Sequence, residues 1–173
     1  TEATARLGIQ EGFSQAYPAI TMESQVTHMG NPLLPLTFRF HVSMLGVLGM
    51  SVDLLEWSDE EIVAGAEQIA LYKEIRPLVQ FGDQYRLLGA QGKTYSAWQY
   101  VGKDRAEAVL FAFRTHMREP ARIPPIYLQG LDPAANYTVE GFDEVRSGHA
   151  WMNIGLRIPL GNFESTVRRI KRV

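Results

Sequence analysis

The pattern of apolar residues changes near Pro77, and this change limits the folds that the chain can adopt. Before Pro77 the sequence holds helical spacings and long apolar stretches, which are typical of helices packed on buried strands. After Pro77 it holds short alternating segments separated by turn residues, which are typical of antiparallel sheets. The sequence therefore predicts an α/β part over residues 1–77, followed by an antiparallel β-sandwich over residues 78–173.

The first part predicts a helix over 2–17, ended by Pro18, and a short strand over 19–22. Residues 36–50, LTFRFHVSMLGVLGM, stay apolar for longer than a half-exposed strand would. Such a run favours strand segments buried on both faces, as in parallel sheets covered by helices. Gly46 and Gly49 within this run indicate places where two backbones come close.

A second helix begins with a clear capping signal. Ser58 is followed three residues later by Glu61, the spacing of a capping box, and Trp57 and Ile62 stand at the staple positions around it. The helix is expected to end at Pro77. Its core-facing stripe is predicted to be Ile62, Ala66, Ile69, Ala70 and Ile75.

The second part of the chain offers seven strand candidates separated by turn residues such as Gly, Pro, Asn and Asp. They are residues 83–88, 95–101, 107–114, 126–128, 136–140, 154–158 and 163–170. Short strands at this spacing indicate an antiparallel sandwich.

Composition excludes several classes of function. The 173 residues carry a net charge of -2 with acids and bases interspersed, so nothing favours nucleic acid or an anionic membrane as a partner. No apolar run reaches the roughly 20 residues of a membrane-spanning helix. Cysteine is absent, which removes disulfides and thiolate chemistry and is compatible with the cytoplasm, the location we expect.

Two polar residues are candidate ligand contacts. Glu23 follows the strand predicted over 19–22, the place where functional residues sit in a βα barrel. The alternative is an ordinary solvated loop acid. His28 lies in the same loop and is a candidate for a polar role in a cleft.

The remaining polar and aromatic residues predict no metal site and no cofactor. The four histidines do not pair at a metal-ligand spacing, and His41 lies inside an apolar stretch, which favours a core histidine. Trp98 and Tyr100 fall on one face of a predicted strand. They could stack on sugars, but a core position is the commoner use of such residues.

Five stretches, taken together and in order, carry a resemblance to a known family. They read TEATARLGIQEGFSQAYP, TMESQVTHMGNP, LTFRFHVSMLGVLGMSVDLLEWSDEE, IALYKEIRPLVQFGDQYRLL and LQGLDPAANYTVEG. This ordered set resembles the C-terminal part of bacterial α-galactosidases of glycoside hydrolase family thirty-six. The resemblance covers nearly the whole chain.

The resemblance implies a fold for each half of the chain. Residues 1–77 would be the last βα units of a (β/α)₈ catalytic barrel, with strand seven at 19–22 and strand eight around 45–50. Residues 78–173 would be the C-terminal antiparallel β-sandwich domain. The parent enzyme would be a retaining α-galactosidase that removes terminal α-galactosyl residues from oligosaccharides.

The resemblance also implies where the site residues lie. Both catalytic aspartates of the family would fall upstream of Thr1, so we expect no catalytic residue in this chain and no activity from it alone. The family commonly has a histidine near position 25, where this chain has Gln25, which could still donate a hydrogen bond. Glu23, Gln25 and His28 are thus the expected substrate-binding residues.

The expected partners follow from the same family. They are an α-galactoside oligosaccharide in the full enzyme, the remainder of the barrel, and further copies of the chain in a homo-oligomer, with no nucleic acid and no membrane. A different class of function stays open: a non-catalytic β-sandwich that binds carbohydrate or mediates oligomerisation. Exposed aromatic residues in a row on one sheet face would favour binding, whereas buried ones would favour a supporting role.

Overall fold

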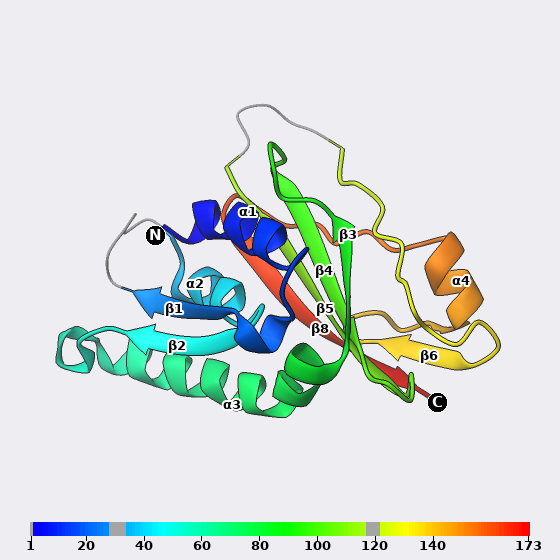
Figure 1. The fold of residues 1–173 in the computed structure, drawn as a ribbon, viewed down its shortest axis with the longest axis horizontal. Helices are drawn as coiled ribbons and strands as arrows, with labels where there is room; N and C mark the ends of the chain where they lie inside the picture. The colour runs from blue at the N-terminus through cyan, green and yellow to red at the C-terminus, as the bar shows by residue number, and fades with distance from the viewer. Residues whose placement is uncertain (1, 28–33, 117–121) are drawn as a thin grey trace.

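The computed structural model describes residues 2–27, 34–116 and 122–173, and within these ranges it holds two sheets and the helices that pack between and around them (Figure 1). The helices are α1 (Ala3–Phe13), α2 (Leu36–Ser43), α3 (Asp59–Phe81) and α4 (Gly148–Asn153), with short 3-10 turns at Ala19–Thr21 and Leu54–Glu56. The strands are β1 (Glu23–Thr27), β2 (Val47–Ser51), β3 (Asp83–Leu88), β4 (Tyr95–Val101), β5 (Glu107–Arg114), β6 (Asn136–Val139), β7 (Val145–Ser147) and β8 (Glu164–Arg172).

The first sheet is a parallel pair, β1 and β2, in which Glu23 lies opposite Val47 and Thr27 opposite Ser51. Each strand is followed by a helix, so the chain runs β1–α2–β2–α3. This is the alternation of strand and helix that parallel sheets require, because a crossover connection must return the chain to the same end.

Gly46 sets the start of the parallel pair. A Cβ atom at this position would lie 2.1 Å from the carbonyl oxygen of Met22. That same oxygen accepts a hydrogen bond of 2.8 Å from the amide of Val47. Only glycine therefore lets the two backbone segments meet here, and the close approach predicted at Gly46 is confirmed.

The second sheet is antiparallel, with six strands in the order β3-β4-β5-β8-β6-β7. Strands β3, β4 and β5 have the predicted bounds, and β8 extends the predicted strand at its C-terminal end. Residues 126–128 and 154–158 are not full strands: they meet only at one bridge, between Ile126 and Leu156. The predicted antiparallel sheet is confirmed, whereas the sandwich remains a proposal.

Both faces of the six-stranded sheet are covered, and alternate residues of β5 show this. Phe111 and Phe113 belong to a core shared with Leu7 of α1 and Phe38 of α2, whereas Leu110 faces Trp151 of α4. Figure 1 shows α1, α2 and α3 on one side of the sheet and α4 on the other. The core positions predicted for Trp98, Tyr100 and His41 are confirmed, since each is at most 5% exposed.

Residues 19–22 are not a strand. The amides of Thr21 and Met22 bond back to the carbonyls of Pro18 and Ala19 and form a 3-10 turn, and β1 begins one residue after it. The predicted helix over 2–17 is also shorter, since α1 ends at Phe13.

The apolar run over 36–50 is half helix. Residues 36–43 form α2, which packs against β1, α3 and β8 and is therefore surrounded by protein. A helix buried all round has the same unbroken apolar sequence as a buried strand, and periodicity cannot separate the two. Only the second half of the run supplies a strand, β2.

Helix α3 begins as predicted but continues past Pro77 to Phe81. Pro77 is exposed, so the carbonyl four residues earlier can face water, while buried Val79 continues the packed face. The predicted stripe is wrong at Ile62, Ala66 and Ala70, which are exposed. The buried residues of α3 are Gly65, Tyr72, Ile75 and Val79.

Candidate functional site

The open face of the β1–β2 pair holds two of the predicted binding residues. Along β1, Ser24 and Val26 point into the core, and Glu23 and Gln25 therefore point to the opposite, exposed face. The Gln25 side-chain amide donates a hydrogen bond of 3.0 Å to Glu23 Oε1. The structure thus brings a carboxylate and an amide together, groups that can bond to sugar hydroxyls.

Gly49 on the neighbouring strand makes room for this pair. It lies opposite Gln25 in the parallel register. A Cβ atom at Gly49 would lie 2.8 Å from Glu23 Oε1 and 3.0 Å from Gln25 Cγ. The crowding at Gly49 is therefore with side chains and not with the second backbone that was predicted for this glycine.

Glu23 stands at the other end of its strand from the predicted one. It begins β1 at the amino end, because residues 19–22 form a turn and not the strand that it was expected to follow. In a βα barrel the carboxyl ends of the strands carry function, and here that end is Thr27. Gln25 lies between the two ends, and His28 lies outside the described residues.

Arg39 holds the carboxyl end of β1. Its guanidinium donates a hydrogen bond of 3.0 Å to the carbonyl of Thr27, while its buried Nε has no partner among the described residues. Burial lowers the pKa of Arg39 below its ordinary value, and the carboxylate of Glu61 opposes this shift. Arg39 was not named as a candidate residue from the sequence. The signal that could have found it is a single cation inside the apolar run over 36–50.

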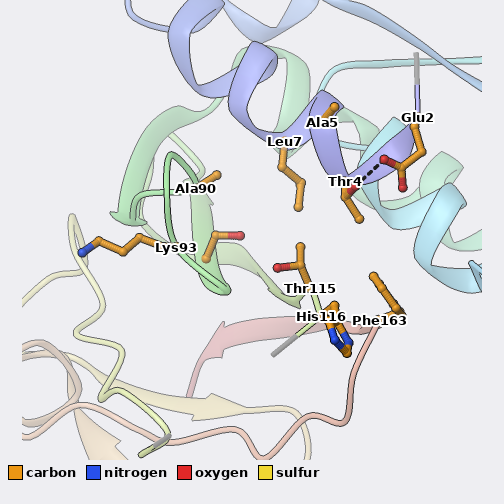
Figure 2. Close-up of a pocket in the computed structure, with 10 residues that line it drawn as sticks. Glu2, Thr4, Ala5, Leu7, Ala90, Lys93, Thr115, His116 and Phe163 are labelled. Atoms are coloured by element: carbon orange, nitrogen blue, oxygen red, sulfur yellow. Dashed lines mark hydrogen bonds between the residues drawn. The ribbon is translucent and has the colours of Figure 1, made fainter. Parts of the chain in front are cut away.

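A hollow of about 460 Å³ lies elsewhere, between α1 and the near end of the six-stranded sheet. Figure 2 shows Leu7 from α1 and Thr115 from the segment after β5 pointing toward one another across it, with His116 and Phe163 stacked at one side. No sequence prediction named this place. Its residues come from segments far apart in the chain, so only the fold brings them together.

Neither a metal site nor a membrane helix is found in the described ranges. No group of three or more His, Asp or Glu side chains in residues 2–27, 34–116 and 122–173 could hold a metal ion. In the same ranges, none of the helices has the length and apolar character needed to cross a membrane.

Two family models match the chain in succession. The model described as "Melibiase" matches residues 1–82, and the model described as "Glycosyl hydrolase family 36 C-terminal domain" matches residues 95–170. The chain belongs to glycoside hydrolase family 36. The two matches together cover both sheets of this family 36 chain, and the family resemblance drawn from its five stretches is confirmed.

Individual relatives agree with this assignment. A probable α-galactosidase C from Aspergillus terreus is 38% identical over 172 residues, which cover 96% of this chain and 22% of that protein. Solved structures of two α-galactosidases from Geobacillus stearothermophilus, AgaB and AgaA in complex with raffinose, each have a TM-score of 0.92. They are 36% and 35% identical, and each match covers 100% of this chain and 25% of the relative.

Two facts qualify the resemblance. The family 36 chain spans only about a quarter of the length of these relatives. The relatives include a fungal protein as well as bacterial ones, so the similarity is not restricted to bacterial enzymes.

Proposed function

We propose that the chain is the C-terminal part of a retaining α-galactosidase that hydrolyses terminal α-galactosyl residues from oligosaccharides. The observation that carries this proposal is the pair of family matches over 1–82 and 95–170, and relatives named α-galactosidases support it. The relative that was solved with raffinose supports an α-galactoside oligosaccharide as the substrate.

Residues 1–77 are proposed to be the last βα units of a (β/α)₈ barrel. The order α1–β1–α2–β2–α3, with parallel strands, supports this, because a barrel of this kind repeats strand and helix. Within the described residues β1 and β2 pair only with each other, so each presents one unpaired edge to which a further strand could add.

The outer surfaces of α1 and α3 also support further barrel units. On α1, Ile9 and Phe13 are 49% and 40% exposed, and on α3, Ile62 and Val63 are 41% and 59% exposed. Apolar surface of this kind gains about 25 cal/mol for each Å² that a neighbour covers. The helices of flanking βα units are the proposed neighbours, and they would make up the remainder of the barrel.

The chemistry would be a double displacement by two carboxylates about 5–5.5 Å apart, one a nucleophile and the other an acid and base. Both are proposed to lie upstream of Thr1. The proposed contribution of this chain is substrate contact by Gln25, oriented by Glu23, with His28 as a further contact. Cytoplasmic location and homo-oligomer formation stay predictions.

The six-stranded sheet is proposed to support the barrel rather than to bind carbohydrate through an aromatic row. Trp98 and Tyr100, which could have stacked on sugars, are at most 1% exposed, and so is Trp151. Buried rings stabilise a core and are not available to stack on a sugar.

A chimera tests the proposed activity. This chain would replace the matching quarter of the Geobacillus stearothermophilus AgaA enzyme, and hydrolysis of raffinose and of an aryl α-galactoside would be measured. We expect hydrolysis by the chimera, with the α-anomer of galactose formed first, and no hydrolysis by the chain alone.

Controls make the result decisive. Gln25→Ala in the chimera should lower kcat/KM, whereas Phe81→Ala, an exposed change at the end of α3, should not. Turnover by the isolated chain that survives Glu23→Gln would mean that other groups do the chemistry. A folded but inactive chimera would also contradict the proposal.

A further inference from the structure

The hollow beside α1 has the size and boundaries of a small-molecule site. Its volume of about 460 Å³ falls in the range of roughly 300–1,000 Å³ that such sites occupy. It is bounded by the first turns of α1, the β3–β4 turn, the start of β4 and the residues that flank β5 and β8. Segments from both halves of the chain therefore build it.

Ser96 offers a hydroxyl group to the hollow. It lines the hollow, is 3% exposed, and its hydroxyl has no hydrogen-bond partner among the described residues. It lies on the same face of β4 as Trp98 and Tyr100, the face that the helices cover. Its oxygen is open to the hollow rather than sealed in the core, so it can exchange hydrogen bonds with water or with a bound hydroxyl group.

Phe163 provides a flat apolar wall. Its ring stacks on that of His116 with centroids 5.9 Å apart and planes 18° apart. Its backbone φ is 56°, in the left-handed region where a bulky residue is a genuine outlier. Strain of this kind persists where the surroundings hold it and concentrates at binding sites.

The charged side chains that line the hollow, Glu2 and Lys93, are one of each sign. The Glu2 carboxylate accepts a hydrogen bond of 2.6 Å from the Thr4 hydroxyl, and the Lys93 side chain points outward at the rim (Figure 2). The remaining lining groups are hydroxyls and apolar side chains, including Thr115, Leu7 and Ala90. This set suits a ligand with many hydroxyls, an apolar face and no charge.

We propose that this hollow binds a neutral saccharide unit. One apolar face of the sugar ring stacks on Phe163, and its hydroxyls bond to Ser96 and Thr115. The site does not depend on the proposed hydrolytic activity, because it lies wholly within the described residues of this chain.

Binding can be measured on the full 173-residue chain by NMR, with the ¹⁵N-labelled protein titrated with D-galactose and with raffinose. The amides around Ser96, Thr115 and Phe163 should shift and saturate. Ser96→Ala removes one hydrogen bond and should raise Kd about fivefold. Phe163→Gly removes the ring and should raise Kd about tenfold.

Phe163→Gly is chosen because glycine adopts a positive φ without strain, so the turn before β8 should keep its conformation. Phe81→Ala, a change at an exposed phenylalanine on α3, is the matched control and should leave Kd unchanged. Thermal melting of each variant checks that the chain stays folded.

Three outcomes would overturn the proposal. One is the lack of any saturating shift at sugar concentrations well above a millimolar Kd. Another is a set of shifts confined to Glu23–Thr27, which would place the sugar on β1. The third is inorganic phosphate moving the signals at the hollow while neither sugar does, which would make it an anion site.

Discussion

Ser58 fixes the start of the longest helix. Its hydroxyl accepts a hydrogen bond of 3.2 Å from the amide of Glu61, and the Glu61 carboxylate accepts one of 3.0 Å from the amide of Ser58. Ser58→Ala should lower the free energy of unfolding by about 1 kcal/mol through loss of this cap. Thermal or denaturant melting would measure the change.

A change at an exposed serine outside any helix start gives the control for this experiment. Ser51→Ala on β2 should leave the melting midpoint nearly unchanged. An unchanged midpoint for Ser58→Ala as well would mean that the capping box contributes nothing measurable to the fold.

Trp57, just before the cap, is buried, and its predicted staple contact with Ile62 stays a prediction. Ile62 is exposed, and Trp57 packs against Gly65 and Phe40. A Cβ atom at Gly65 would lie 2.6 Å from the Trp57 ring. This contact explains why position 65 holds glycine, although glycine weakens a helix by about 1 kcal/mol relative to alanine.

His41 makes stability depend on pH. It is 5% exposed, and its Nδ1 lies 2.8 Å from the Ser165 hydroxyl. Burial lowers the pKa of His41 from 6.5 to about 4, an effect that the neighbouring Gln68 side chain of α3 partly opposes. The ring is therefore neutral in the folded protein at pH 7.

The direction in which stability changes with pH follows from proton binding at His41. Between pH 6.5 and 4 the unfolded chain binds a proton at His41 and the folded protein does not, so stability falls as pH falls through this window. The loss at pH 5 should be about 2 kcal/mol. Denaturant melting at pH 7 and pH 5 should show a larger loss in the wild type than in His41→Gln. Equal losses would contradict the prediction.

At the scale of elements, α1 is tied to the turn between β3 and β4. Glu11 Oε2 accepts hydrogen bonds of 2.7 Å and 3.0 Å from the amides of Ala90 and Gln91. Gly89 allows this approach, since a Cβ atom there would lie 2.7 Å from Glu11 Oε1. Arg86 of β3 adds a second tie to Ser14, at the end of α1.

Breaking the Glu11 tie should loosen this turn. Glu11→Ala removes the acceptor for two amides and should destabilise the local contact by about 1–2 kcal/mol. Hydrogen exchange at Ala90 and Gln91 should then be about tenfold faster. Glu67→Ala, an exposed change on α3, is the matched control. Unchanged exchange at both amides would show that the turn is held without α1.

At the scale of the whole molecule, the helices and the six-stranded sheet share one core. The cluster that holds Phe38 and Phe40 of α2 also holds Trp98, Tyr100 and Phe111 of the sheet. The division at Pro77 stays a prediction. Either part alone would expose to water the inner surface that the other part covers in the full chain.

This shared core predicts that residues 83–173 alone lack a stable fold. The sheet would expose a large aromatic face that α1, α2 and α3 cover in the full chain. We expect binding of a hydrophobic dye and loss of a cooperative thermal transition relative to the full chain. A cooperative transition of the isolated segment at the same temperature would contradict this prediction.

Local sequence by itself determined the elements that depend on neighbouring residues. The cap at Ser58 and the bounds of β3, β4 and β5 are as predicted, because a capping box and turn chemistry act over a few residues. The family could also be predicted, since ordered stretches of sequence carry it without reference to a structure.

Only the tertiary structure decided which apolar segments are helices and which faces are buried. Residues 36–43 form a helix because protein surrounds them, and an unbroken apolar run has no period that would show this. Exposed Ile62 and Ala66 carry the same apolar signal as buried Ile75, because hydrophobicity does not say which neighbour covers a face.

One candidate site could be predicted from the sequence, and the other is decided only by the tertiary structure. Glu23 was named from its place after a predicted strand and Gln25 from the family resemblance, although the end of the strand predicted for Glu23 was wrong. The hollow of Ser96 and Phe163 could not be named, because its residues are distant in the chain and individually ordinary. Distances between such residues are set by packing of the two sheets and the helices between them, which no local pattern encodes.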